Sequence, residues 1–141
     1  MMRLGALPLL LIVTAASAPP VSVVAATGDW SNLPEIRDNG SDHQSKNLML
    51  ALTDIAIKRE CALPGFKGDR FDFNMSFAAF FEADGSLRQI VIPKLNCPKA
   101  EAVIGGTLQE MIEGGDYKPP ARGKPGWYGG DLSFFIDEAS H

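Results

Sequence analysis

Every second residue from Phe71 to Phe81 is apolar, and this pattern constrains the fold more than any other feature of the chain. The apolar positions are Phe71, Phe73, Met75, Phe77, Ala79 and Phe81. Neighbouring side chains on a β-strand point to opposite faces of a sheet, so the pattern predicts a strand with one face in a hydrophobic core. Phe80 falls on the other face, where we expect it to contact a helix or a partner.

A tight turn and a second strand follow the first strand. Asp84 and Gly85 are typical turn residues, and glycine supplies a positive φ. Residues 87–95 (LRQIVIPKL) read as the returning strand. Pro93 suits the end or the edge of that strand because it has no N–H to donate. The two strands predict an antiparallel hairpin.

A helix is expected on the N-terminal side of this hairpin. Ser41–Gln44 is an S-x-x-Q capping box, which predicts a helix that runs to about Glu60. The apolar residues at helical spacing are Leu48, Leu52, Ile55 and Ala56. This spacing places them on one buried face.

A second helix is expected after the hairpin. Pro98 fits the first turn of a helix, where its missing N–H costs nothing, and Gly114–Gly115 end it. Its apolar stripe consists of Val103, Ile104, Leu108, Met111 and Ile112. Gly105 and Gly106 weaken the middle of this helix, and we expect them to allow close approach to the sheet.

The chain ends with a loop rich in Gly and Pro over residues 116–130 and a last strand at Asp131–Ile136. The expected order is helix, strand, strand, helix, strand. This order predicts an α+β fold, with a β-β-α-β core and an additional N-terminal helix, in one domain over residues 41–141.

The N-terminus resembles an export signal. Arg3 is the only charged residue before Asp29, and an apolar run over residues 4–18 is followed by small residues. We expect cleavage after Ala25 or Ala26, which makes residues 1–26 a signal peptide. The alternative is an uncleaved membrane anchor, but Pro8, Pro19 and Pro20 interrupt the run, and a spanning helix needs about 20 continuous apolar residues.

Residues 27–40 are polar and contain Pro and Gly, so we expect a flexible arm between this signal and the domain. Trp30 and Leu33 are the residues that could attach it to the body. An exported chain of this kind is periplasmic or secreted and keeps no stable membrane anchor after cleavage.

The chain contains two cysteines, Cys61 and Cys97. An even pair in an exported protein predicts a disulfide. Their spacing lacks the C-x-x-C of redox pairs, and neither cysteine has a histidine beside it, so we do not expect a redox or metal site. The bridge would connect the first helix to the hairpin and the second helix.

Six pieces of the chain carry a resemblance when they are taken in order. A strand ends in the Asp84-Gly85 turn, a strand of the type xVxxVxI and an amphipathic helix follow, and Tyr117-Lys118-Pro119 forms an aromatic-K-P sequence. Gly123-Lys124-Pro125 and a closing strand over residues 132–136 complete the series. Over residues 71–136 the chain resembles the TonB C-terminal domain family.

The resemblance implies a small non-enzymatic periplasmic domain. Such domains bind extended segments of outer-membrane receptors by strand addition and take part in transport across the outer membrane. The chain departs from the family because it has no evident Pro-rich spacer, and Leu95-Asn96-Cys97-Pro98 replaces the usual Ser-Ser-Gly. We therefore expect a TonB-like binding or adaptor domain. The alternative is a small secreted structural or inhibitory module that uses the fold without energy transduction.

The last strand and the loop before it supply the candidate binding residues, which are Trp127, Tyr128, Asp131, Ser133 and Phe135. A late single strand often lies at a sheet edge, where unpaired N–H and C=O groups can bind a partner strand. Trp127 and Tyr128 are expected to anchor that partner. The competing interpretation is that the loop aromatics cap the core and the neighbouring cations are solvated.

Other classes of function find no support in the sequence. The formal charge of −4 does not favour nucleic acid as a partner. His43 and His141 are the only histidines and lack further ligands nearby, so we expect no metal site. No G-x-S-x-G or phosphate-loop motif is present. We expect no cofactor and no enzymatic activity.

Overall fold

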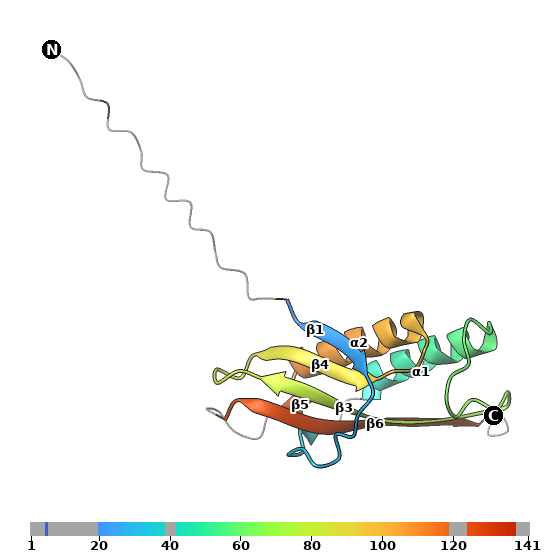
Figure 1. The fold of residues 1–141 in the computed structure, drawn as a ribbon. Helices are drawn as coiled ribbons and strands as arrows, with labels where there is room; N and C mark the ends of the chain where they lie inside the picture. Colours follow the sequence, from blue (N-terminus) through green and yellow to red (C-terminus); the bar gives the residue numbers. More distant parts are fainter. Residues whose placement is uncertain (1–4, 6–19, 39–41, 119–123, 138–141) are drawn as a thin grey trace.

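The computed structural model describes Gly5 and residues 20–38, 42–118 and 124–137. Two helices cover one face of a four-stranded sheet (Figure 1). The elements are β1 (Ser22–Ala26), β2 (Arg37–Asp38), α1 (Asp42–Ile57), β3 (Arg70–Phe81), β4 (Leu87–Pro93), α2 (Pro98–Glu113), β5 (Tyr117–Lys118) and β6 (Gly126–Asp137). The fold is therefore α+β, as predicted. The capping residue Ser41 lies outside the described residues.

The sheet is mixed and has the strand order β1-β4-β3-β6. β3 pairs antiparallel with β4 and β6, whereas β1 pairs parallel with β4. The short strands β2 and β5 form a separate antiparallel pair. β3 thus lies inside the sheet and β6 forms one of its two sides.

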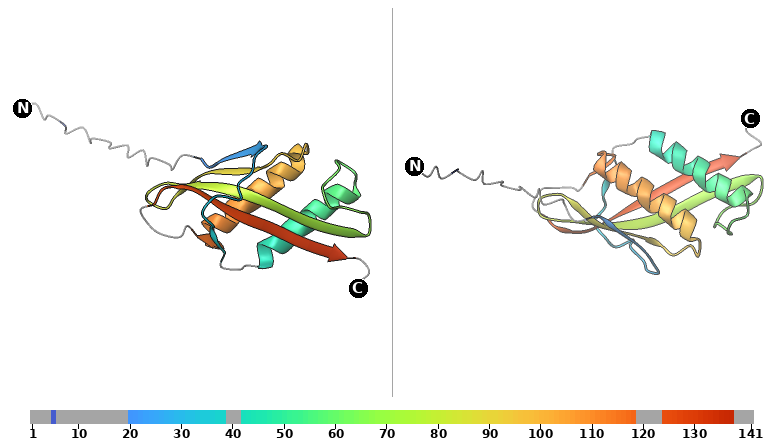
Figure 2. Two further views of the ribbon diagram at one scale, coloured as in Figure 1. Left: turned by 60° about the horizontal axis from the view of Figure 1, so that its bottom comes forward. Right: turned by 90° about the horizontal axis from the view of Figure 1, so that it is seen from above.

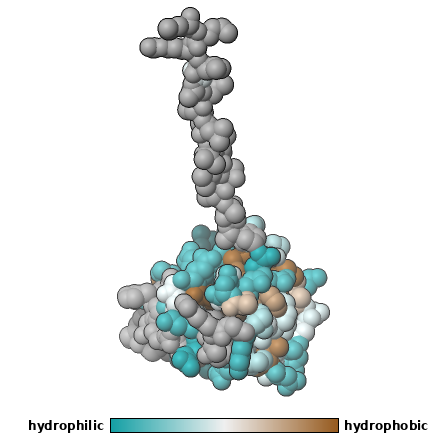
Figure 3. Space-filling view, turned by 90° about the vertical axis from the view of Figure 1, so that its left-hand side faces the viewer, coloured by the Kyte–Doolittle hydropathy of each residue, from teal (hydrophilic) through white to brown (hydrophobic). Residues whose placement is uncertain are grey.

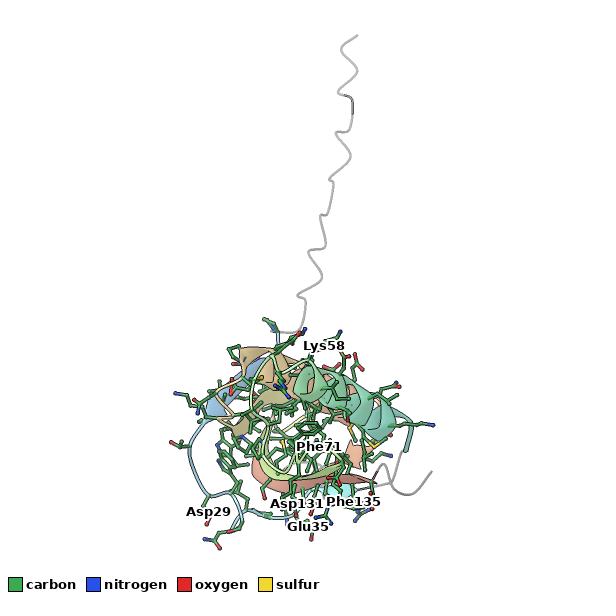
Figure 4. All side chains as sticks on the ribbon, turned by 90° about the vertical axis from the view of Figure 1, so that its right-hand side faces the viewer. Asp29, Glu35, Lys58, Phe71, Asp131 and Phe135 are labelled. Carbon is green, nitrogen blue, oxygen red and sulfur yellow. A yellow bond between two sulfur atoms is a disulfide. The ribbon has the colours of Figure 1, made fainter. Side chains whose placement is uncertain are left out.

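The predicted apolar face of β3 forms the centre of the core. All six alternate side chains are at most 8% exposed, and they point toward the helices; they are Phe71, Phe73, Met75, Phe77, Ala79 and Phe81. Phe71 and Phe73 pack edge to face, with ring centroids 5.9 Å apart. Figure 4 shows Phe71 between the sheet and the helices. Burial of these aromatic rings is a large favourable term in folding.

Both helices lie side by side over the same face of the sheet (Figure 2). The predicted stripes are buried in each: Leu48, Leu52, Ile55 and Ala56 in α1, and Ile104, Leu108, Met111 and Ile112 in α2. Val103, which the sequence predicts as part of the second stripe, is only partly buried. α2 ends at Glu113, and Gly115 follows with a φ of +89°. Glycine adopts this left-handed conformation at little cost, so the predicted end of the helix is confirmed.

The last strand is longer than the sequence predicts, because it starts at Gly126 rather than at Asp131. β3 has twelve residues, and its second half pairs with residues 126–130 of β6. The glycines that suggested a loop serve close packing instead. A Cβ on Gly130 would lie 2.6 Å from the ring of Phe77, and one on Gly129 would lie 3.0 Å from the carbonyl oxygen of Trp30.

The described part of the predicted flexible arm is docked on the sheet. Ile36 is 2% exposed, and its N–H donates to the carbonyl oxygen of Gly129 at 2.8 Å. The N–H of Gly129 donates to the carbonyl oxygen of Pro34, also at 2.8 Å. We call Pro34–Ile36 the strap. The sequence missed it because a single buried isoleucine among polar residues has no periodicity.

β1 lies in the segment that the sequence pattern assigns to the signal peptide. Residues 22–26 pair with residues 89–93 of β4 over five positions. Val21 and Ala25 pack against the core on the helix side. This strand was not predicted, because the apolar run that precedes it dominates the pattern.

Cys61 and Cys97 form the predicted disulfide, with their Cα atoms 5.8 Å apart. Cys61 follows α1 and Cys97 directly precedes α2, so the bridge joins the two helices. Glu60 and Lys99 form an ion pair of 2.8 Å beside it. In the chain-entropy model, a bridge that closes a loop of this length adds about 3–4 kcal/mol to stability.

We expect Cys97→Ser to lower the free energy of unfolding by about 3 kcal/mol, because the unfolded chain regains the entropy of the open loop. Urea titrations of the wild type, Cys61→Ser, Cys97→Ser and the double variant would measure this. The double variant should lose about as much as each single variant, since all three remove the same bond. Thiol labelling of the freshly isolated native wild type would contradict the bridge.

Candidate functional site

The sheet has two outer edges, and they differ in length. β1 has five residues and is preceded by Pro20, which lacks an N–H. β6 has twelve residues and pairs with β3 on one side only. Short edge strands and prolines discourage strand addition, whereas a long edge strand invites it. β6 is therefore the candidate binding edge.

The strap fixes which backbone groups of β6 point outward. Both the N–H and the C=O of Gly129 bond to the strap, on the side away from β3. The carbonyl oxygen of Asp131 points the same way and accepts a hydrogen bond from the Tyr117 hydroxyl at 3.4 Å. The register with β3 is continuous, so outward-facing groups recur at every second residue. Ser133 and Phe135 follow at that spacing.

The outward N–H and C=O groups of Ser133 and Phe135 form the open part of the edge. Within the part of the chain that the structure describes, neither the strap nor any strand pairs with β6 on this side beyond Asp131. Unpaired backbone groups in an edge strand are what an added strand binds. The strap thus covers the first half of the edge and leaves the second half open.

Side chains on the face away from the helices flank this open edge. Phe135 is 58% exposed, and Asp131 accepts a hydrogen bond from the Ser76 hydroxyl at 2.8 Å. Figure 4 shows Asp131 and Phe135 on the opposite side of β6 from the helices. At the other end of β6, Trp127 is 37% exposed and packs against Phe80, with ring centroids 5.3 Å apart. Four of the five predicted residues therefore have outward side chains.

Tyr128 is the exception, and its predicted role as a partner anchor is corrected. Its side chain is 5% exposed, on the helix side of the sheet, where it packs against Phe81 at a centroid distance of 5.8 Å. Its hydroxyl donates to the carbonyl oxygen of Lys124 at 2.8 Å. Neighbouring residues on a strand face opposite ways, so Trp127 and Tyr128 cannot both face one partner side chain.

The sequence did not identify the helix side of this edge as part of the site. Leu50 and Ile57 of α1 are 56% and 59% exposed. They are seven residues apart, so they lie on one flank of the helix. Ile57 and Thr53 line a small cavity of about 20 Å³ together with Ile136 of β6. An apolar flank of α1 therefore lies beside the end of the open edge.

A signal for this flank was present in the sequence. The apolar stripe that predicts the buried face of α1 leaves Leu50 and Ile57 outside it. Two large apolar residues at helical spacing outside the core stripe indicate a second apolar flank. The sequence does not show on which side of the helix β6 lies.

Other hollows on the surface do not gather reactive groups. One of about 520 Å³ lies at the end of α1 beside Cys61, and one of about 570 Å³ lies between the β3–β4 turn and the end of α2. Figure 3 faces the turn end of the molecule, where small apolar areas are interspersed with polar ones. In the described ranges, no three His, Cys, Asp or Glu side chains form a group that could hold a metal. His141 and the His43 side chain lie outside those ranges.

The shifted pKa values have local causes. The hydroxyl and the backbone N–H of Ser86 donate to Asp84 and lower the pKa of that carboxyl group. A hydrogen bond and an ion pair of 3.0 Å with Asp54 raise the pKa of Lys58. Asp84 stabilises the β3–β4 turn and Lys58 the end of α1, and both groups are solvated, so these shifts do not point to an acid–base site.

Neither helix of the described chain is both long and apolar enough to cross a membrane. The chain matches no protein-family model, no curated protein and no solved structure.

The direction of the backbone groups leads to a test with a matched pair of proline variants. Ser133→Pro removes an outward N–H, so we expect the fold to survive with a loss of about 1 kcal/mol or less. Phe134→Pro removes an N–H that points to β3 and also replaces a ring packed on Phe73, so it should cost about 3 kcal/mol or more. Circular dichroism and thermal melts would measure both. Equal unfolding by the two variants would place Ser133 inside the hydrogen-bonded ladder.

Proposed function

We propose that this protein is a periplasmic, non-enzymatic binding or adaptor domain that takes up an extended segment of a partner protein along β6. One observation carries the proposal: at the end of a long edge strand, no described strand or strap residue pairs with the outward backbone groups of Ser133 and Phe135. An added strand satisfies such groups and is recognised through its main chain.

The order of elements supports a TonB C-terminal-like domain. β3, β4, α2 and β6 form a β-β-α-β series in chain order, with α1 before it and the two-residue β5 between α2 and β6. β5 contains the first two residues of the aromatic-K-P sequence, and β6 starts directly after the G-x-P sequence. The resemblance implies strand addition at an exposed sheet edge, and β6 forms such an edge here. The geometry of β6 and the resemblance thus favour the same mode of binding.

The two sides of the edge indicate which partner side chains fit. An added strand points alternate side chains toward α1 and toward the open face. On the α1 side they meet the exposed flank of Leu50 and Ile57. On the open face they meet Phe135. We infer that the partner segment is extended and carries apolar residues on its α1 side.

The export signal and the resemblance together favour a segment of an outer-membrane receptor as the partner. The sequence before the domain bears on energy transduction. The apolar run that ends at Ala18 is followed almost directly by β1. No Pro-rich spacer separates the two. This arrangement favours an adaptor, or the alternative of a small secreted structural or inhibitory module, over a domain that transmits motion from the inner membrane.

Binding to a receptor can be tested with the exported protein as bait. We expect the wild type and Ser133→Ala to recover an outer-membrane receptor from a detergent extract of the envelope. Ser133→Pro should reduce recovery about tenfold or more, which corresponds to about 1.4 kcal/mol, because it removes a donor and places a ring on the edge. Equal recovery by all three would exclude this edge. Recovery of a secreted protein alone would favour the alternative module.

The apolar flank of α1 gives an independent test. Ile57→Asp should weaken binding of the recovered partner, because a carboxylate at this position would be desolvated by the added strand. Lys58→Ala is the matched control, since its side chain is exposed and next in sequence but paired with Asp54. Isothermal titration with the recovered receptor segment would measure both. A larger loss for Lys58→Ala than for Ile57→Asp would show that electrostatics, not the apolar flank, selects the partner.

A further inference from the structure

β1 is bonded into the sheet and packed on its helix side. Its five residues pair in parallel with β4, and the N–H of Lys94 donates to the carbonyl oxygen of Ala26 at 3.1 Å. Val21 and Ala25 lie against the core, while Val23 faces α2. Figure 1 shows β1 alongside β4 at one side of the sheet. The strand therefore extends both the sheet and the core.

The middle of α2 is shaped to fit β1. A Cβ on Gly105 would overlap the side chain of Val23, and the three heavy atoms nearest to it all belong to that side chain. A Cβ on Gly106, the next residue, would meet nothing within 4 Å. Glycine in the interior of a helix lowers its stability, and at position 105 the cost coincides with the contact to β1. Gly105 thus provides a notch in α2 against which the side chain of Val23 packs.

These two observations bear on where the chain is processed. Cleavage after Ala25 or Ala26 would remove β1, leave the edge of β4 unpaired and leave the notch at Gly105 empty. A run of small residues also lies further upstream, at Ala15–Ala18, where the apolar run ends. Small residues at that place are typical of a signal-peptide cleavage site.

We propose that the exported protein keeps β1 and that signal peptidase cuts within Ala15–Ala18, on the N-terminal side of Pro20. In this step one water molecule hydrolyses one peptide bond. The leader gains a new carboxylate and the mature chain a new amino terminus. The inference rests on the export that the proposed function assumes, and it extends that proposal by assigning the processing site. A retained β1 keeps the β4 edge covered, so β6 is the long open edge of the mature sheet.

The mature N-terminus is the direct measurement. The full-length chain is expressed with its own leader, and the protein from the periplasmic fraction is analysed by intact mass and N-terminal sequencing. We expect a start between Ala16 and Ala18. A start at Ala26 or Thr27 would overturn the inference but leave the binding function of β6 untouched. An intact Met1 in the inner membrane would overturn both the processing site and the export on which it rests.

A pair of glycine variants tests retention of β1 in the same exported protein. Replacement of a glycine in a helix interior by alanine normally stabilises the helix. If β1 is present, Gly106→Ala should raise Tm by a few degrees, whereas Gly105→Ala should lower it through the overlap with Val23. Adding Val23→Ala to Gly105→Ala should recover the loss, because it removes the overlapping methyl groups. If both single variants raise Tm equally, β1 does not occupy the notch, and the inference fails.

Discussion

The buried face of β3 is the feature on which the rest of the structure depends. Its six alternate side chains, four of them phenylalanines, point into the layer between the sheet and the helices. Both helices turn their apolar stripes toward this face, and β4 and β6 pair with the two sides of the strand. Since aromatic rings bury large areas, this single strand organises most of the hydrophobic core of the domain. The disulfide then joins the ends of α1 and α2 that meet above it.

Because β3 is a central strand, the sheet has two outer edges, which are formed by β1 and β6. These two edges differ in how they are covered. β1 covers β4 with a short strand that starts two residues after Pro20, so little open backbone remains on that side. On β6, the strap pairs at Gly129 and then leaves the edge. The remaining half of β6 contains Ser133 and Phe135. The exposed side chain of Phe135 lies on one face of this half, and the apolar flank of α1 lies on the other. Partial cover of this kind shortens the stretch of edge that is open to edge-to-edge pairing.

The candidate site is thus built by parts of the chain that are far apart in sequence. The strap, near the start of the domain, sets where the open edge begins. α1 supplies an apolar flank on one side, and Phe135 lies on the other. The same arrangement explains why Tyr128 belongs to the core while Trp127 does not, because one step along a strand reverses the direction of the side chain.

The sequence by itself determined the elements whose signals are local. The alternation from Phe71 to Phe81, the helical stripes of α1 and α2, and the cysteine pair each predicted a feature that the structure contains. The tertiary structure alone decided the start of β6, the docking of the strap, the pairing of β1 and the apolar flank beside the open edge. These features depend on which neighbour satisfies a backbone group or covers a side chain. The sequence does not show whether a glycine lies in a loop, in a close contact or in a helix notch. For Gly129 and Gly105, only the residues packed against them distinguish these cases.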